Sequence, residues 1–176
     1  MFCCKKKFEL KDYIENVANF PKEGIQFKDI SPILENPKAL KYVINQFTKF
    51  AKKVKADVIV GVESRGFIFG TPLALKTGLP FVLARKPNKL PRETNTVTYD
   101  LEYGTSSLQM HKGAIKPNQR VLIVDDLLAT GGTVKATEEL VKFDGGIVAG
   151  CCFVVELADL NGRNKINSEI CSLIKY

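Results

Sequence analysis

Short apolar runs alternate with segments of helical periodicity along most of this chain, and that alternation constrains its fold more than any other feature. The apolar runs lie at residues 57–62, 80–84, 121–125 and 146–157. They have no regular polar face, which is typical of strands buried within a parallel sheet. Segments 67–77 and 133–143 follow the first and third runs and read as helices. We therefore predict an α/β fold, with a mostly parallel, twisted sheet and helices on both of its faces.

Two more helices are expected before the first strand, and one more strand at the end of the chain. Apolar residues recur with helical spacing between Leu10 and Ala18, which predicts an amphipathic helix over residues 10–19. A second helix is expected to begin near Pro37, because proline suits the first helical turn. Its expected buried stripe is Leu40, Val43, Ile44, Phe47, Ala51 and Val54. Residues 170–176 are expected to form a last edge strand.

The composition is that of one ordinary globular domain. The chain has 176 residues, of which 45% are hydrophobic and 26% charged. No stretch is apolar enough to cross a membrane, and the basic N-terminal run has no apolar region behind it, so it does not read as a secretory signal. Five cysteines, an odd number, favour reduced thiols. We expect a single cytoplasmic domain over residues 1–176, with no membrane partner.

The net charge of +7 favours an anionic partner. The basic residues form short clusters beside glycine and proline turns, not one long stripe, so we expect small phosphorylated ligands and no nucleic acid. One basic cluster follows Cys3 and Cys4. Lipidation of these cysteines is one interpretation, and an ordinary solvated terminus is the interpretation we favour.

The loop after the apolar run 121–125 carries the clearest chemistry. Glycines let backbone N–H groups converge on a ligand, and the N-terminus of the following helix adds positive potential. Threonine hydroxyls add further donors. The loop contains no Gly-Lys-Ser/Thr ending and no G-x-G-x-x-G pattern, so it is neither a Walker A loop nor a Rossmann fingerprint. It predicts a cradle for one phosphate, made by Ala129, Thr130, Gly131, Gly132 and Thr133.

Two adjacent carboxylates, Asp125 and Asp126, precede this cradle. Carboxylates directly against a triphosphate would repel it, whereas beside a monophosphate they can accept hydrogen bonds from sugar hydroxyls. We therefore expect a ribose 5-phosphate, with its phosphate in the loop and its 2′- and 3′-hydroxyls on the acidic pair. The alternatives for the pair are a metal site or an acidic helix-capping turn.

The string Val-Asp-Asp-Leu-Leu-Ala-Thr-Gly-Gly-Thr, which ends at Thr133, resembles the phosphoribosyl pyrophosphate motif of type I phosphoribosyltransferases. Its wording is most similar to that of the adenine-specific members, and the resemblance runs from about Phe20 to the C-terminus. It implies purine salvage: the ribose 5-phosphate of phosphoribosyl pyrophosphate is transferred to adenine, giving AMP and pyrophosphate. It also implies the type I fold, with an N-terminal base-binding hood at about residues 1–35 and a flexible lid at about 86–104.

Two more segments at strand ends suit anions. The turn between Gly61 and Gly66 resembles the family's pyrophosphate loop, in which the peptide at Glu63–Ser64 is typically cis. The cationic loop 85–91 follows the next strand. The resemblance assigns pyrophosphate contacts to Glu63, Ser64, Arg65, Arg85, Lys86 and Lys89. Taken alone, the first segment also reads as an ordinary strand–helix turn and the second as a solvated charged loop.

The segment Thr96–Leu101 alternates like a strand within the long connection 86–104, which fits a ribbon that closes as a lid. The resemblance places the catalytic acid at Glu102, in the sequence Glu-Tyr-Gly. One carboxyl there can take the proton from the attacking purine and return it in the reverse reaction. Without the resemblance, Glu102 reads as a surface carboxylate.

The segment Phe20–Pro32 resembles the hood over the base. Phe27 against Leu127 would sandwich a purine, and a backbone carbonyl near Gln26 would accept from its 6-amino group. We expect the adenine-binding residues to be Gln26, Phe27, Lys28 and Leu127. The family commonly has arginine where this chain has Lys28, and lysine keeps the charge but lacks the planar fork. Taken alone, Phe27 reads as a core residue.

Mg²⁺ is expected to travel with the pyrophosphate substrate, with no direct protein ligand, and the family resemblance implies a homodimer. Two other functions stay open at this point. One is a 6-oxopurine phosphoribosyltransferase, whose hood would have to donate to O6 of the base. The other is a non-catalytic regulator that binds phosphoribosyl pyrophosphate and nucleic acid.

Overall fold

A computed structural model describes residues 8–100 and 104–176 of the chain. The chain divides into two compact units, Met1–Val43 and Ile44–Tyr176. The long helix α2 (Pro37–Lys53) begins at the expected proline in the first unit and ends in the second. Among the helices of the described residues, none combines the length and the apolar character that crossing a membrane requires.

The first unit contains an antiparallel hairpin between a short 3-10 turn, η1 (Leu10–Tyr13), and helix α1 (Ser31–Glu35). The hairpin strands are β1 (Glu15–Ala18) and β2 (Gln26–Asp29). The predicted helix over residues 10–19 is therefore wrong. Val17 is β-branched and pairs with Phe27 across the hairpin, so this segment bonds to a partner strand and not within a helix.

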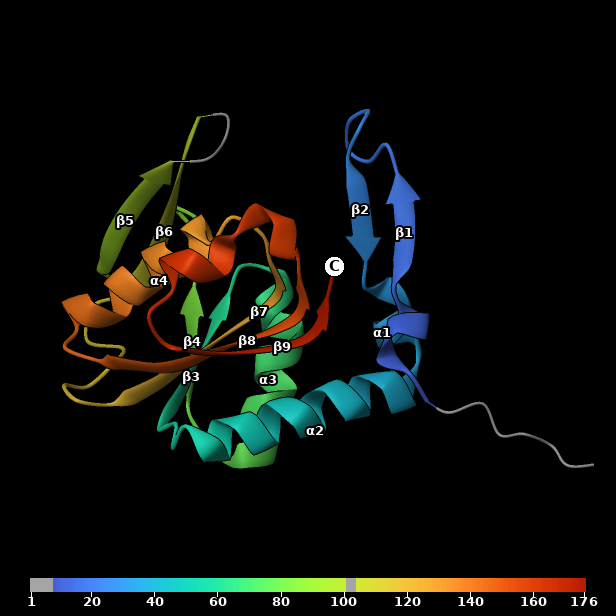
Figure 1. Ribbon diagram of the computed structural model, residues 1–176. Helices are drawn as coiled ribbons and strands as arrows, with labels where there is room; N and C mark the ends of the chain where they lie inside the picture. The colour runs from blue at the N-terminus through green and yellow to red at the C-terminus, as the bar shows by residue number, and fades with distance from the viewer. Residues whose placement is uncertain (1–7, 101–103) are drawn as a thin grey trace, which may run out of the picture. The chain divides into compact units, whose positions relative to one another are not determined.

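The second unit is built on a five-stranded parallel sheet of order β4-β3-β7-β8-β9 (Figure 1). Its strands are β3 (Val58–Val62), β4 (Phe81–Ala84), β7 (Arg120–Leu128), β8 (Ile147–Glu156) and β9 (Glu169–Lys175). The predicted parallel sheet and the predicted edge strand at the C-terminus are confirmed. β7 runs past its predicted end at Asp125, because it keeps pairing with β8 as far as Leu128.

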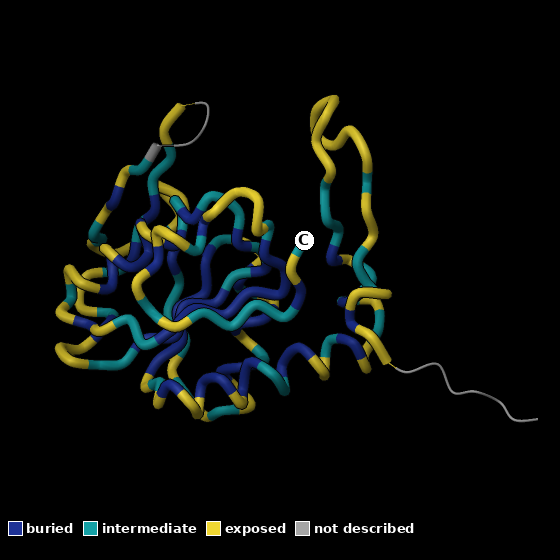
Figure 2. The backbone as a smooth tube through the Cα atoms, in the orientation of Figure 1, coloured by how far each residue is buried: buried dark blue, intermediate teal, exposed yellow. Residues whose placement is uncertain are grey.

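Helices cover both faces of this sheet, as predicted. Strand side chains alternate between the faces, and on one face Val60 and Ile123 share a buried cluster with helix α4 (Gly132–Phe143). Helix α3 (Arg65–Thr77) lies on the other face, where Gly70 packs directly against the ring of Phe81. Figure 2 shows that the buried residues concentrate in the strands between these helices.

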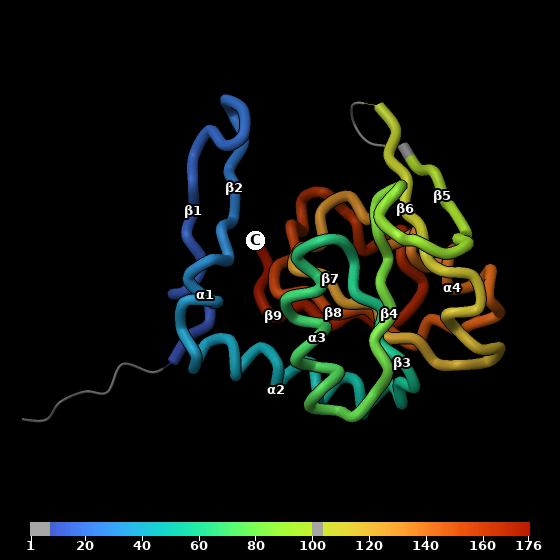
Figure 3. Tube along the Cα trace, turned by 180° about the vertical axis from the view of Figure 1, so that it is seen from behind, coloured from blue at the N-terminus to red at the C-terminus, as the bar shows by residue number. Residues whose placement is uncertain are grey.

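A two-stranded antiparallel ribbon, β5 (Thr94–Asp100) and β6 (Thr105–His111), follows β4. β6 and β4 lie side by side (Figure 3), and the backbones of Arg85 and Gln109 join them. The strand-like stretch predicted in the lid is confirmed, but β6 was not predicted. Val97, Leu108 and Met110 are buried in the core, so the base of the ribbon belongs to the packed body of the second unit.

The strand order determines where ligands can bind. From β3 the chain passes through α3 to β4 on one side, whereas β7 pairs with β3 on the other side. Such a switch point leaves a crevice beyond the carboxyl ends of the two central strands. The Glu63 turn follows β3 at this edge, and Asp125 and Asp126 lie in the last part of β7.

Candidate active site

A cleft of about 340 Å³ opens at this switch point, within the second unit. Its wall includes the carboxyl end of β7, the loop that leads into α4 and side chains of the ribbon. The lining residues are Glu63, Arg65, Lys86, Tyr99, Ser106, Leu108, Asp125, Asp126, Leu127, Leu128, Ala129, Thr130, Gly131, Gly132, Thr133 and Val134. The structure therefore brings together the whole predicted phosphate loop, the acidic pair and two of the predicted cations.

The phosphate loop is shaped by glycine. Gly131 has a φ of 79°, a left-handed conformation that favours glycine, and it stands immediately before the first residue of α4. No side chain among the described residues caps this helix end, so the N–H groups of its first turn are left as donors for a ligand. Together with the hydroxyls of Thr130 and Thr133, they form a site suited to one phosphate group.

The acidic pair lies beside this loop in a poorly solvated position. Asp126 is 3% exposed, and Arg65 Nε lies 2.9 Å from its carboxylate. Burial raises the pKa of Asp125 well above its ordinary value, and the adjacent charge of Asp126 adds to the rise. Burial also raises the pKa of Asp126, although Arg65 opposes that rise. Both residues line the cleft, where their carboxyl oxygens can accept hydrogen bonds from hydroxyl groups.

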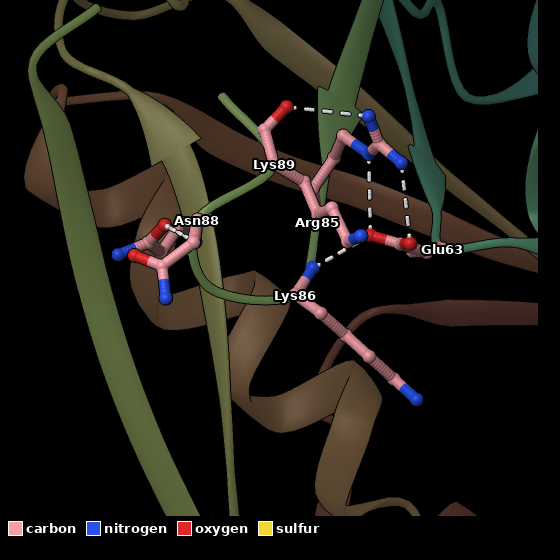
Figure 4. Close-up of polar contacts among 6 residues, drawn as sticks. Glu63, Arg85, Lys86, Asn88 and Lys89 are labelled. Carbon is pink, nitrogen blue, oxygen red and sulfur yellow. Dashed lines mark hydrogen bonds and ion pairs between the residues drawn. The ribbon is translucent and has the colours of Figure 1, made fainter. Parts of the chain in front are cut away.

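Glu63 connects the turn after β3 to the cationic loop after β4 (Figure 4). Its carboxylate accepts two hydrogen bonds of 3.2 Å from the Arg85 guanidinium and one of 2.7 Å from the Lys86 backbone N–H. Burial raises the pKa of Glu63, but these donors outweigh it and hold the pKa below its ordinary value. The peptide bond between Glu63 and Ser64 is cis, as the family resemblance implies.

The predicted pyrophosphate cations differ in their positions. Arg85 Nη1 also donates to the Lys89 carbonyl at 3.3 Å, so its guanidinium holds the loop together. Figure 4 shows the Lys86 side chain extending away from this cluster, and Lys86 lines the cleft. Ser64, Arg85 and Lys89 do not line the cleft in the part of the chain that the structure describes. Arg65 and Lys86 are therefore the predicted cations that reach the site.

The cleft is also lined by residues of the ribbon that were not predicted from the sequence. Tyr99 of β5 and Ser106 of β6 both contribute to its wall. Tyr99 is an aromatic residue in a strand-like stretch, and nothing in its sequence neighbourhood distinguishes it from a core residue. The predicted catalytic residue, Glu102, lies outside the described residues.

In the first unit, Phe27 lies in an apolar hollow of the hairpin, lined by Val17, Phe20, Phe27 and Asp29. The rings of Phe20 and Phe27 meet edge to face, with their centres 5.1 Å apart. Gln26 and Lys28 point to the opposite face of β2, where both bond to Asn16. The hairpin thus separates the Lys28 side chain from the aromatic face that suits a base. Leu127 belongs to the second unit.

Proteins of known structure and function resemble this chain over most of its length. A family model for the phosphoribosyl transferase domain matches residues 29–172. The adenine phosphoribosyltransferase of Ureaplasma parvum serovar 3 is 52% identical over 167 residues, which cover 95% of this chain and 96% of that protein.

Two crystal structures show the same similarity. The adenine phosphoribosyltransferase of Thermoanaerobacter pseudethanolicus matches with a TM-score of 0.91 and 50% identity, covering 95% of this chain and 98% of its own. The enzyme of Saccharomyces cerevisiae, in complex with adenine and an imino-altritol bisphosphate, matches with a TM-score of 0.89 and 42% identity. That alignment covers 93% of this chain and 96% of the yeast chain.

Proposed function

We infer the function from one premise: this chain belongs to the phosphoribosyl transferase family, whose domain model spans residues 29–172. It is an enzyme of purine salvage. It transfers the ribose 5-phosphate of phosphoribosyl pyrophosphate to adenine, and the products are AMP and pyrophosphate. What we propose beyond this reaction is how the residues of the cleft divide the work.

A single observation carries the assignment of the site: the phosphate loop and the acidic pair share one cleft. We assign the 5′-phosphate to the loop Ala129–Thr133 and the two ribose hydroxyls to Asp125 and Asp126. This arrangement would hold the ribose at both ends, so that C1 faces the attacking base in one orientation. Positioning of this kind accounts for a large part of the rate enhancement in transfer reactions.

The pyrophosphate group is assigned to the cations that line the cleft, Arg65 and Lys86. Arg65 is paired with Asp126 in this structure, so its positive charge would lie where the pyrophosphate group meets the ribose. Arg85 and Lys89 would contribute by shaping the loop, since Arg85 is bound to Glu63 and to the Lys89 carbonyl.

Glu102 is assigned as the general acid and base. When the C1–oxygen bond to pyrophosphate breaks, positive charge develops on the ribose, and adenine loses a proton as its nitrogen bonds to C1. A carboxylate in the segment that connects β5 to β6 can accept that proton and return it in the reverse direction. Tyr99 and Ser106, on the two strands that this segment connects, both line the cleft, which supports a role for the segment in the reaction.

Adenine is assigned to the hairpin of the first unit. Its apolar hollow at Phe20 and Phe27 offers the aromatic surface that a purine needs. A backbone carbonyl near Gln26 would accept from the 6-amino group, so the Lys28 side chain, which bonds to Asn16, is left with no part in recognition of the base.

Mg²⁺ is proposed to arrive with phosphoribosyl pyrophosphate. Carboxylates beside a polyphosphate are a donor set that this ion favours, and it commonly keeps substrate oxygens as ligands. The described residues contain no cluster of three or more His, Cys, Asp or Glu side chains that could enclose a metal. We propose that the ion takes its ligands from the substrate and has no direct protein ligand. When bound, the ion would neutralise charge on the leaving pyrophosphate.

The chain is further proposed to act as a cytoplasmic homodimer. Ile68 and Leu75 lie two turns apart on α3 and are 40% and 81% exposed, so this helix presents an apolar surface. Such surfaces mark contact sites between proteins, and the family resemblance points to a second copy of the chain.

Competition between bases tests the proposed acceptor. Adenine and hypoxanthine are supplied together with excess phosphoribosyl pyrophosphate, and formation of AMP and IMP is measured. We expect adenine to exceed hypoxanthine by orders of magnitude in kcat/KM, because a site built for a 6-amino donor leaves its acceptor unpaired against O6. Comparable rates for the two bases would point to the 6-oxopurine enzyme.

A further inference from the structure

A glycine outside the motif packs directly against the phosphate loop. Gly162 begins the short 3-10 turn η3 (Gly162–Lys165), which follows β8. A Cβ added to Gly162 would lie 2.0 Å from the Ala129 carbonyl oxygen, and one added to Gly131 would lie 2.5 Å from the Gly162 carbonyl oxygen. Both separations are far inside van der Waals contact, so the two backbones leave no room for any side chain. The η3 turn therefore supports the loop from behind.

An ion pair holds this turn in place. Arg163 donates two hydrogen bonds to the Glu156 carboxylate, at 2.8 and 2.6 Å, and a weaker one of 3.4 Å to the Ser172 hydroxyl. Glu156 is 4% exposed, and its hydrogen bonds with Arg163, against the effect of burial, lower its pKa to about 2. Bidentate pairing of this kind fixes direction as well as distance.

The ion pair also lies beside the start of the phosphate loop, because β7 and β8 end at the same level of the sheet. Glu156 is the last residue of β8 and pairs in register with Leu128, the last residue of β7. Ala129, whose carbonyl oxygen meets Gly162, follows immediately. One side of the loop is thus attached to the strand beside Glu156, and the other side rests on the turn that Arg163 holds.

We propose that Arg163 and Glu156 are positioning residues for ribose-phosphate binding, acting through Gly162 on the loop Ala129–Thr133. This inference rests on the proposed function, because it assumes that the loop holds the 5′-phosphate. The pair does not line the cleft, so its effect is indirect: it keeps the backbone N–H groups of Gly131 and Gly132 aimed at one point. The pyrophosphate end, at Glu63 and Arg65, has no part in this support.

Binding measurements on the full chain can separate the two ends of the site. The main variant is the double substitution Glu156→Gln with Arg163→Met, which removes the ion pair without leaving a buried charge unpaired. Arg163→Lys keeps the charge but loses the fork. The probes are ribose 5-phosphate and inorganic pyrophosphate with Mg²⁺, and the affinity for each is measured by calorimetry. Ile115→Ala is the control for a general loss of stability. Ile115 is buried beside Gly146, at the end of α4 that lies away from the phosphate loop.

The double variant should bind ribose 5-phosphate about a hundredfold more weakly, the order of effect that a displacement of about 1 Å can have. Pyrophosphate affinity should stay at the wild-type value, and KM should rise for phosphoribosyl pyrophosphate but not for adenine. Arg163→Lys should fall between the wild type and the double variant. Unchanged binding of ribose 5-phosphate would overturn the inference, as would an equal loss for both probes or the same pattern in Ile115→Ala.

A loop variant distinguishes failure of this inference from failure of the proposed function. Thr133→Val removes a donor from the loop itself and should weaken ribose 5-phosphate alone. If it does so while the double variant binds normally, the loop assignment stands and the positioning role is wrong. If Thr133→Val binds ribose 5-phosphate as the wild type does, the loop is not the phosphate site, and the positioning role falls with it.

Discussion

The Tyr99 hydroxyl lies 3.2 Å from the Thr133 hydroxyl, and this contact joins the ribbon to the first turn of α4. Thr133 has a single O–H group, which it can donate to a bound phosphate while its oxygen accepts from Tyr99. The two hydroxyls would then form a chain from the ribbon to the ligand. The ribbon and the phosphate loop are thus connected by two residues that both line the cleft.

We expect Tyr99→Phe to raise KM for phosphoribosyl pyrophosphate by about two- to tenfold, which corresponds to the roughly 0.5–1.5 kcal/mol of one hydrogen bond. KM for adenine should not change, since this contact lies at the phosphate. Steady-state kinetics with each substrate varied in turn measure both values. Tyr42→Phe, at an exposed position on α2, is the matched control and should have no effect. An unchanged KM in Tyr99→Phe would show that the contact is not used in binding.

Glu102→Ala should lower turnover by about 10²–10⁴-fold, the usual contribution of a general acid or base. Affinity for phosphoribosyl pyrophosphate should stay largely intact, because the loop and the acidic pair hold the ribose. Single-turnover kinetics and equilibrium binding separate the two effects. Glu93→Ala is the control, because it removes the same charge at another position. Glu93 directly precedes β5, is 84% exposed and pairs with Lys112. Turnover near the wild-type level would remove Glu102 from the mechanism.

The sequence predicts the second unit better than the first, for a physical reason. Apolar runs such as 121–125 can be stabilised only inside a sheet covered on both faces, so pattern and structure agree. In the segment 10–19, the same apolar residues fit a helix or a strand, and the pairing of Val17 with Phe27 decides between them. β6 was not predicted, although its buried residues, Leu108 and Met110, are separated by one polar residue, as the alternation of a strand requires.

The same limit applies to the site. The phosphate loop is contiguous, so its glycines and threonines can be recognised from their order alone. The Arg163–Glu156 ion pair joins the η3 turn to the end of β8. The η3 turn in turn packs against the loop that follows β7. The Glu63–Arg85 ion pair likewise joins two loops that are neighbours only because β3 and β4 pair. Such contacts depend on the fold and have no local signal in the sequence.

The Glu156–Arg163 ion pair should make stability depend on pH in acid. The folded pKa of Glu156, about 2, lies below its ordinary value of 4.5, so the ionised form is favoured by folding. Its contribution is fully present above pH 4.5 and is lost as the pH falls toward 2. The free energy of unfolding, measured by urea titration, should therefore converge between the wild type and Glu156→Gln/Arg163→Met over that interval. A difference that stays constant down to pH 2 would contradict this linkage.

Two glycines of α3 offer a matched test of how closely that helix must approach β7. A Cβ at Gly66 would lie 2.4 Å from the Val124 carbonyl oxygen, and one at Gly70 would lie 2.5 Å from the ring of Phe81. A ring can rotate, whereas the Val124 carbonyl belongs to a central strand immediately before Asp125. We therefore expect Gly66→Ala to be the more damaging, with a loss of roughly 1–3 kcal/mol in the free energy of unfolding.

Gly66→Ala should also raise KM for phosphoribosyl pyrophosphate, because displacing α3 moves Arg65 away from Asp126. Gly70→Ala should change stability alone, and equal effects of the two variants on KM would show that the approach of α3 to β7 does not position the acidic pair.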